Sequence, residues 1–152
     1  MTYADFTRSG LPDPVIKPEF YTDTGTKRMI AWFIDTVLIL LLCLIIIPFT
    51  AFTALFFLPF LYLIVGLAYR TITLANRSAT WGMRLMAVEF RDNRGQAMTL
   101  PLAFIHTLGY TVSVSMVLPQ VVSIVLMMTT PRGQGLSDLV LGTAAVNHAG
   151  AQ

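Results

Sequence analysis

The chain has 152 residues, of which 55% are hydrophobic and 12% charged, and its formal net charge at pH 7 is +2. This length fits one domain, and the charged share is about half that of soluble domains. The small net charge without a dense basic patch argues against nucleic-acid binding, and the single cysteine, Cys43, excludes an intrachain disulfide and a cysteine-cluster metal site.

Residues 1–26 form the first segment of the chain. They contain several prolines and Gly25 but no sustained apolar period, which is typical of a loosely ordered segment. We therefore expect a flexible cytoplasmic tail that lies at the membrane surface.

Two hydrophobic runs follow, at residues 29–47 and 51–69. Each has about the length that one bilayer crossing requires, and no Asp, Glu, Lys or Arg occurs from residue 36 through residue 69. The connection at residues 48–50 is too short for anything but an antiparallel hairpin. We expect Pro59 to kink the second helix. The two runs predict a pair of membrane-spanning helices.

The polar loop of residues 70–99 carries the strongest topological signal, because basic residues collect there and just before the first hydrophobic run. They are Arg70, Arg77, Arg84, Arg91 and Arg94 in the loop, and Lys27 and Arg28 before the run. By the positive-inside rule, this side of the membrane is cytoplasmic. Within the loop, residues 85–90 alternate as a short strand does, and a strand-like segment ending at Val146 could pair with them.

The apolar stretch from residue 100 to residue 130 is too long for one straight crossing, because such a helix would measure about 45 Å against a hydrocarbon thickness of about 30 Å. Leu118-Pro119-Gln120 offers a break. This gives a helix over 101–117 and a short return over 120–130, with Arg132 and the C-terminus on the cytoplasmic side. The alternative is one tilted helix with the C-terminus outside.

These elements predict an all-α membrane protein. We expect a bundle of three to four transmembrane helices, arranged as two helical hairpins, with a short β pairing in a small cytoplasmic loop. The membrane domain would cover residues 27–148 and lie in the cytoplasmic membrane, with both termini cytoplasmic.

Asp35 stands out because it lies inside an apolar helix, about 10 Å below the interface. An ionised carboxylate there costs several kcal/mol unless it is paired, hydrated or protonated. It is therefore either an ionisable functional site or a hydrogen-bonded lock between helices. Arg28 lies nearly two turns earlier on the same face, too far for a direct bond. Arg28 either sets topology or pairs with another carboxylate.

Two further groups of polar residues are candidates. Asp138 follows a glycine-rich turn and either caps a short helix or lies beside Arg28 or Arg84 at the cytoplasmic mouth of the bundle. A secondary polar stripe shares one helical face, which we expect to point inward, toward Asp35. The stripe consists of His106, Tyr110 and Ser113.

Catalysis and metal binding find little support. One His and one Asp without further ligands do not make a metal site. No nucleophile stands with an oriented base, so we expect neither an enzyme nor a cofactor.

Three residues, with the segments around them, resemble the RDD family of small integral membrane proteins, which is named for one arginine and two aspartates. Arg28 corresponds to the arginine at the head of the first helix. Asp35 corresponds to the aspartate inside that helix, and Asp138 to the aspartate near the end of the chain.

Two loop motifs extend the likeness. Gly82 and Arg84, in a Thr-x-Gly-x-Arg segment, resemble the middle loop of the family, and Gly142 and Thr143 end a Leu-x-x-Gly-Thr segment like the family's closing one. The chain departs from the family in having a methionine between Gly82 and Arg84, where lysine is usual. It also has only His106 where many members carry basic residues in the third helix.

The resemblance implies residence in the membrane and a suggested role in transport, without naming a substrate. One interpretation is a small carrier of an ion or solute, homo-oligomeric because four short segments enclose little space, with Asp35 cycling between protonated and ion-bound states. The other is a non-catalytic accessory or assembly subunit of a larger membrane complex, in which the Arg and Asp residues lock a helical scaffold. The lipid bilayer is a partner in both.

Overall fold

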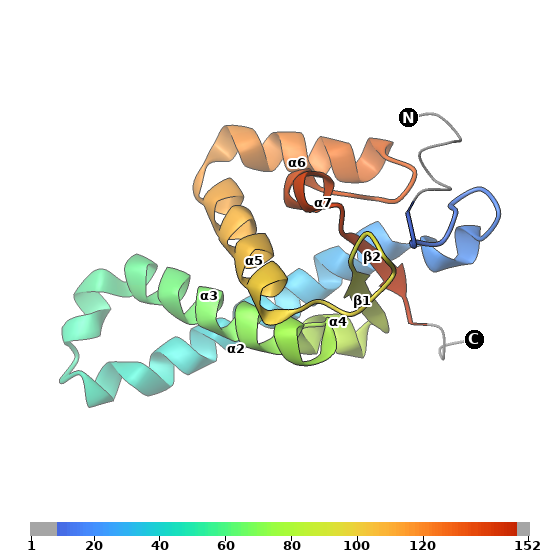
Figure 1. Cartoon of the computed structure of the whole chain (residues 1–152). Coiled ribbons are helices and arrows are strands. Elements are labelled where there is room, and N and C mark those ends of the chain that lie inside the picture. Colours follow the sequence, from blue (N-terminus) through green and yellow to red (C-terminus); the bar gives the residue numbers. More distant parts are fainter. Residues whose placement is uncertain (1–8, 149–152) are drawn as a thin grey trace.

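The structure, a computed structural model, describes residues 9–148 and consists mostly of helices (Figure 1). Helices α2 (Thr24–Phe49) and α3 (Leu58–Arg77) form an antiparallel hairpin whose tip, with the 3-10 helix η2 (Thr53–Phe57), extends away from the rest of the molecule. Two segments are long and apolar enough to cross a membrane, Pro18–Phe49 and Thr53–Arg77.

The next two helices form a bent pair. Helices α5 (Leu100–Ser115) and α6 (Val117–Thr129) meet at an angle of 115°, so residues 9–148 contain two candidate spans, or three if this pair counts as one. The bend lies at Met116, whose backbone is extended, and Pro119 falls in the first turn of α6, where a missing N–H costs no helical bond. The break thus lies earlier than the expected Leu118-Pro119-Gln120.

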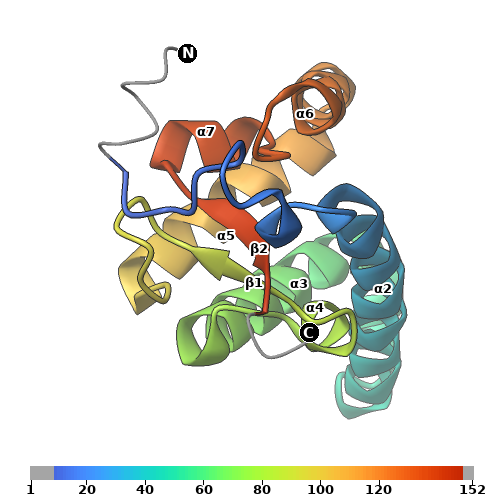
Figure 2. The ribbon, with the colours of Figure 1, turned by 90° about the vertical axis from the view of Figure 1, so that its right-hand side faces the viewer.

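The remaining short elements form a cap at the open end of the hairpin. They are α4 (Trp81–Leu85), β1 (Val88–Arg91), α7 (Leu136–Leu141) and β2 (Ala144–Asn147). Strands β1 and β2 pair antiparallel, with Val88 opposite Asn147 and Arg91 opposite Ala144 (Figure 2). A mostly helical fold with candidate membrane spans and a short β pairing is therefore confirmed, whereas the bundle of three to four crossings stays a prediction.

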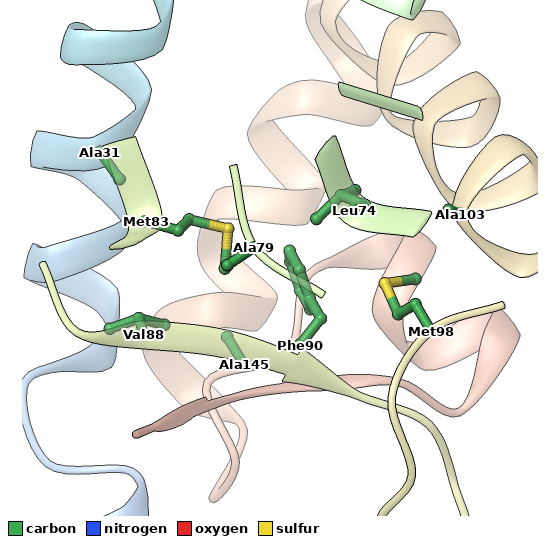
Figure 3. Close-up of a cluster of buried hydrophobic side chains, with 9 residues drawn as sticks. All are labelled: Ala31, Leu74, Ala79, Met83, Val88, Phe90, Met98, Ala103 and Ala145. Carbon is green, nitrogen blue, oxygen red and sulfur yellow. The ribbon is translucent and has the colours of Figure 1, made fainter. Parts of the chain in front are cut away.

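The hydrophobic core lies where the cap meets the bases of α2, α3 and α5 (Figure 3). Its members are Ala31, Leu74, Ala79, Met83, Val88, Phe90, Met98, Ala103 and Ala145. Farther out, the large apolar side chains of the hairpin are exposed, Leu44 and Phe56 among them. An apolar outer surface over a compact base is what a lipid environment requires.

The segment before α2 is ordered from residue 9 onward, unlike the flexible tail expected for residues 1–26. It contains the 3-10 helix η1 (Pro18–Phe20), and the Tyr21 hydroxyl donates a hydrogen bond to the Pro12 carbonyl at 2.8 Å. The Asn147 amide of β2 donates to the carbonyl of Glu19 at 2.7 Å. The segment is thus tied to the cap through the Glu19 carbonyl. Residues 1–8 lie outside the described part.

The second arm of the hairpin also differs from its predicted bounds of 51–69. Helix α3 begins at Leu58 and continues to Arg77. Pro59 occupies its first turn, which suits a residue without a backbone N–H, so this proline starts the helix and does not kink it. Tyr69 and Arg70 lie within this helix, and both side chains reach the Asp35 carboxylate.

Candidate functional site

Asp35 is 1% exposed, and both oxygens of its carboxylate accept hydrogen bonds. The Tyr69 hydroxyl of α3 donates to Oδ1 at 2.8 Å, and the Thr80 hydroxyl donates to Oδ2 at 2.6 Å. The backbone N–H of Gly82 donates to Oδ1 at 3.0 Å. These residues form what we call the Asp35 network, which joins α2, α3 and α4.

The network is built around the N-terminus of α4, where backbone N–H groups lack partners within the helix. Thr80 is the N-cap, and its hydroxyl accepts from the N–H of Met83 at 3.2 Å. The Tyr69 hydroxyl accepts from the N–H of Trp81 at 3.2 Å. Together with the Gly82 bond, the backbone N–H groups of Trp81, Gly82 and Met83 all donate to side chains of the network.

Gly82 lets α4 lie directly on α2. A Cβ atom at this position would lie 2.3 Å from the Ala31 carbonyl oxygen, which is far inside any allowed contact. Ala31 stands one turn before Asp35 on the same face of α2. Glycine is therefore required for the backbone approach that places the Gly82 N–H on the Asp35 carboxylate.

Arg70 adds a charge beside this network without a hydrogen bond to it. Its Nη1 lies 3.7 Å from Oδ2 of Asp35, and its guanidinium lies 4.6 Å from the centre of the Tyr110 ring. The arginine thus balances the charge of Asp35 inside the span.

Asp138 forms the second network, and it is also 1% exposed. Its Oδ2 accepts from Nη1 of Arg28 at 2.8 Å and from the N–H of Gly135 at 2.9 Å. Its Oδ1 lies 2.6 Å from Nε2 of His106. Arg28 also donates to the Gly133 carbonyl at 3.0 Å. We call these residues the Asp138 network; it joins α2, α5 and α7.

The surroundings of Asp138 hold it in the charged form. Burial raises the pKa of its carboxyl, but the Arg28 guanidinium, the His106 ring and the Gly135 N–H lower it more. The net result is a pKa well below its ordinary value. Asp138 is consequently an anion at any physiological pH, which suits a permanent ionic contact better than proton transfer.

The two networks are separate, as the two-turn spacing of Arg28 and Asp35 requires. Asp35 makes no hydrogen bond to the polar stripe on α5, and it is linked to Tyr110 of that stripe only through Arg70, which contacts both. His106 bonds Asp138 instead, and its Nδ1 has no hydrogen-bond partner among residues 9–148. The Ser113 hydroxyl donates to the Gln120 side chain at 3.3 Å.

The loop motifs support the networks. The guanidinium of Arg84 stacks 4.7 Å from the Trp81 ring and donates to the Ala79 carbonyl at 3.2 Å. Gly142 ends α7 with a φ of +68°, a conformation that favours glycine. Thr143 is fully buried, and its hydroxyl lies 3.4 Å from Oδ1 of Asp138.

Sequence reasoning missed several partners of the two carboxylates. Nothing local in the sequence marks Tyr69, Arg70 or Gly135 specifically as partners of these carboxylates. Thr80 did carry a local signal, because threonine directly before a short helical segment is typical of an N-cap. In the described part of the chain, no three His, Cys, Asp or Glu side chains gather to hold a metal ion.

The fold and the two networks define a helical membrane protein with a cap fastened to its first hairpin by two buried aspartates. The sequence profile of the RDD family matches residues 24–142, so the chain belongs to the RDD family. No curated protein and no solved structure matches it.

Proposed function

We propose that this RDD-family protein is a non-catalytic membrane scaffold that serves as an accessory or assembly subunit of a larger membrane complex. The observation that carries the proposal is the saturation of Asp35: three donors and Arg70 surround a carboxylate that is 1% exposed. A group so completely engaged between three helices fixes their packing. Its role is to hold the cap in one position on the hairpin.

The proposed orientation places both termini and the cap in the cytoplasm. Its support is the contact between three segments far apart in the chain: Asn147 of β2 donates to Glu19 before α2, and β2 pairs with β1 in the loop after α3. Segments in contact lie on one side of the membrane, so α5 and α6 enter the bilayer and return. The basic residues of this side make it cytoplasmic by the positive-inside rule.

Purification in a mild detergent tests the accessory role. The expected result is a membrane protein that co-purifies with this chain in a fixed ratio, both from wild type and from a control in which exposed Arg94 is changed to Gln. Asp35→Asn, which loosens the cap, should reduce the amount of that partner. Recovery of the chain alone, or only as a homo-oligomer, from cells at native expression levels would contradict the accessory role.

A second candidate function is transport, in which the chain is a small carrier of an ion or solute and forms a homo-oligomer because its few crossings enclose little space. The observation that favours it is an ionisable pair, Asp35 and Arg70, inside two candidate spans. Here Asp35 would alternate between protonated and ion-bound states. Proteoliposomes test this directly. Proton or cation flux should occur with wild type and vanish with folded Asp35→Asn, whereas equal flux through both proteins would remove Asp35 from any carrier mechanism.

A further inference from the structure

A cleft of about 220 Å³ lies between α2, α3 and α5, and neither aspartate network uses it. Its lining is mostly apolar and comes from the parts of the helices that lie in the candidate spans. Asp35 is not among the lining residues, whereas Arg70, whose Nη1 lies 3.7 Å from the Asp35 carboxylate, is one of them.

One end of the cleft is polar. The Trp32 indole N–H donates to the Tyr110 hydroxyl at 2.6 Å, so the proton of that hydroxyl remains available to a further acceptor. The Arg70 guanidinium lies over the Tyr110 ring at 4.6 Å. Trp32, Arg70 and Tyr110 all line the cleft at this end.

The other end, farther from the cap, is mostly apolar, with Tyr62 among its lining residues. Going away from the cap, α2 passes from Trp32 to Ile39, and the antiparallel α3 passes from Arg70 to Leu63 (Figure 1). Seven residues of helix measure about 10 Å. The cleft therefore changes from polar to apolar in the same direction as a phospholipid of the cap-side leaflet does.

The Arg70 guanidinium has N–H groups that are available to a further hydrogen-bond acceptor. A guanidinium has five N–H groups, and within residues 9–148 the Arg70 side chain makes the 3.7 Å ionic contact and the ring contact but no hydrogen bond. Asp35 already accepts three hydrogen bonds from other groups. Donors at a largely apolar depth gain strongly from an acceptor, and phosphate matches the guanidinium fork.

We propose that the cleft binds one anionic phospholipid of the surrounding bilayer. The phosphate accepts hydrogen bonds from Arg70 and the Tyr110 hydroxyl, and one acyl chain follows the apolar lining past the exposed side chains of Leu63 and Val114. Charge complementarity selects an anionic headgroup, and the apolar end selects a lipid over a dissolved anion. This site is independent of whether the protein is a scaffold or a carrier.

Fluorescence quenching tests the proposal, because Trp32 lines the cleft. In a Trp81→Phe background, Trp32 is the reporter, since the chain has two tryptophans. The protein is placed in phosphatidylcholine bilayers that contain a minor fraction of brominated phosphatidylglycerol or of phosphatidylcholine with the same brominated chains. We expect the anionic lipid to quench at an about tenfold lower mole fraction, the ratio that one charge-assisted hydrogen bond gives.

Matched variants test whether the preference for the anionic lipid arises at the cleft. Arg70→Gln should abolish it, and Arg77→Gln should preserve it, because Arg77 is exposed at the end of the same helix and lies outside the cleft. Val114→Phe fills the apolar end and leaves the charge intact, so it should reduce quenching by both lipids. This variant also tests the proposal if Arg70→Gln does not fold. Equal quenching by the two lipids, or an unchanged preference in Arg70→Gln, would overturn the proposal. Relief of quenching by dissolved inorganic phosphate would show instead a site for a soluble anion.

Discussion

Arg28 and Asp138 form a salt bridge of 2.8 Å across a sequence separation of 110 residues. Their side chains are 14% and 1% exposed, so the pair is largely shielded from water. The arginine stands near the start of α2 and the aspartate in α7, which lies in the cap. The bond thus joins α2, which begins the hairpin, to α7 near the end of the described chain.

Breaking this pair should be costly, because either partner alone leaves a charge in a buried place. We expect Arg28→Gln and Asp138→Asn each to lower the free energy of unfolding by about 3 kcal/mol. The double variant should lose much less than the sum, since it leaves neither charge unpaired. Chemical unfolding in detergent measures all three, with exposed Arg94→Gln as the control. Additive losses would mean that the two residues act independently.

Acid should weaken this network through Asp138. Its pKa in the folded protein is lower than the ordinary value of 3.8, so the unfolded chain takes up a proton first as pH falls. The stabilisation by Asp138 is therefore complete above about pH 5 and decreases as pH falls through the unfolded value toward the folded one. The stability difference between wild type and Asp138→Asn should shrink below about pH 4. A difference that is constant down to pH 3 would contradict this linkage.

Asp35→Asn should loosen α4 from the hairpin. The amide keeps one acceptor, but its NH₂ group faces a donor, and Arg70 loses its counter-charge. We expect a loss of about 1–3 kcal/mol and faster hydrogen exchange at the backbone N–H of Gly82. Asp23→Asn is the matched control, because Asp23 is exposed and makes no side-chain capping bond. Unchanged exchange at Gly82 would remove Asp35 as the anchor of α4.

The helical hairpin and the β pairing could be predicted because their signals are local: uncharged apolar runs, a short connection and an alternating strand. The bend at Met116 could not, since that residue is no helix breaker and the sequence drew attention to Pro119 instead. Because Pro119 falls in the first turn of α6, the helix accommodates the residue that was expected to interrupt it.

The two aspartates could be singled out because a carboxylate among apolar residues is conspicuous in one sequence. Their partners were harder to predict. Thr80 and Gly82 reach Asp35 only because α4 folds back onto α2, a tertiary contact that no periodicity encodes. His106 was expected to face Asp35, and the structure pairs it with Asp138 because α5 and α7 pack together at the cap.

Gly82→Ala gives the sharpest test of how α4 is seated. The new Cβ would lie 2.3 Å from the Ala31 carbonyl oxygen, and this backbone atom cannot move aside as a flexible side chain could. Helix α4 must therefore move away from α2, which lengthens the hydrogen bond from the backbone N–H of residue 82 to Asp35. We expect a loss of about 1–3 kcal/mol, as for other overpacked positions. Gly25→Ala is the control within α2, because nothing lies within 4 Å of its Cβ. That change should be neutral or stabilise the helix by up to about 1 kcal/mol. Thermal unfolding in detergent compares the two, and equal midpoints for Gly82→Ala and wild type would show that α4 does not rest on Ala31.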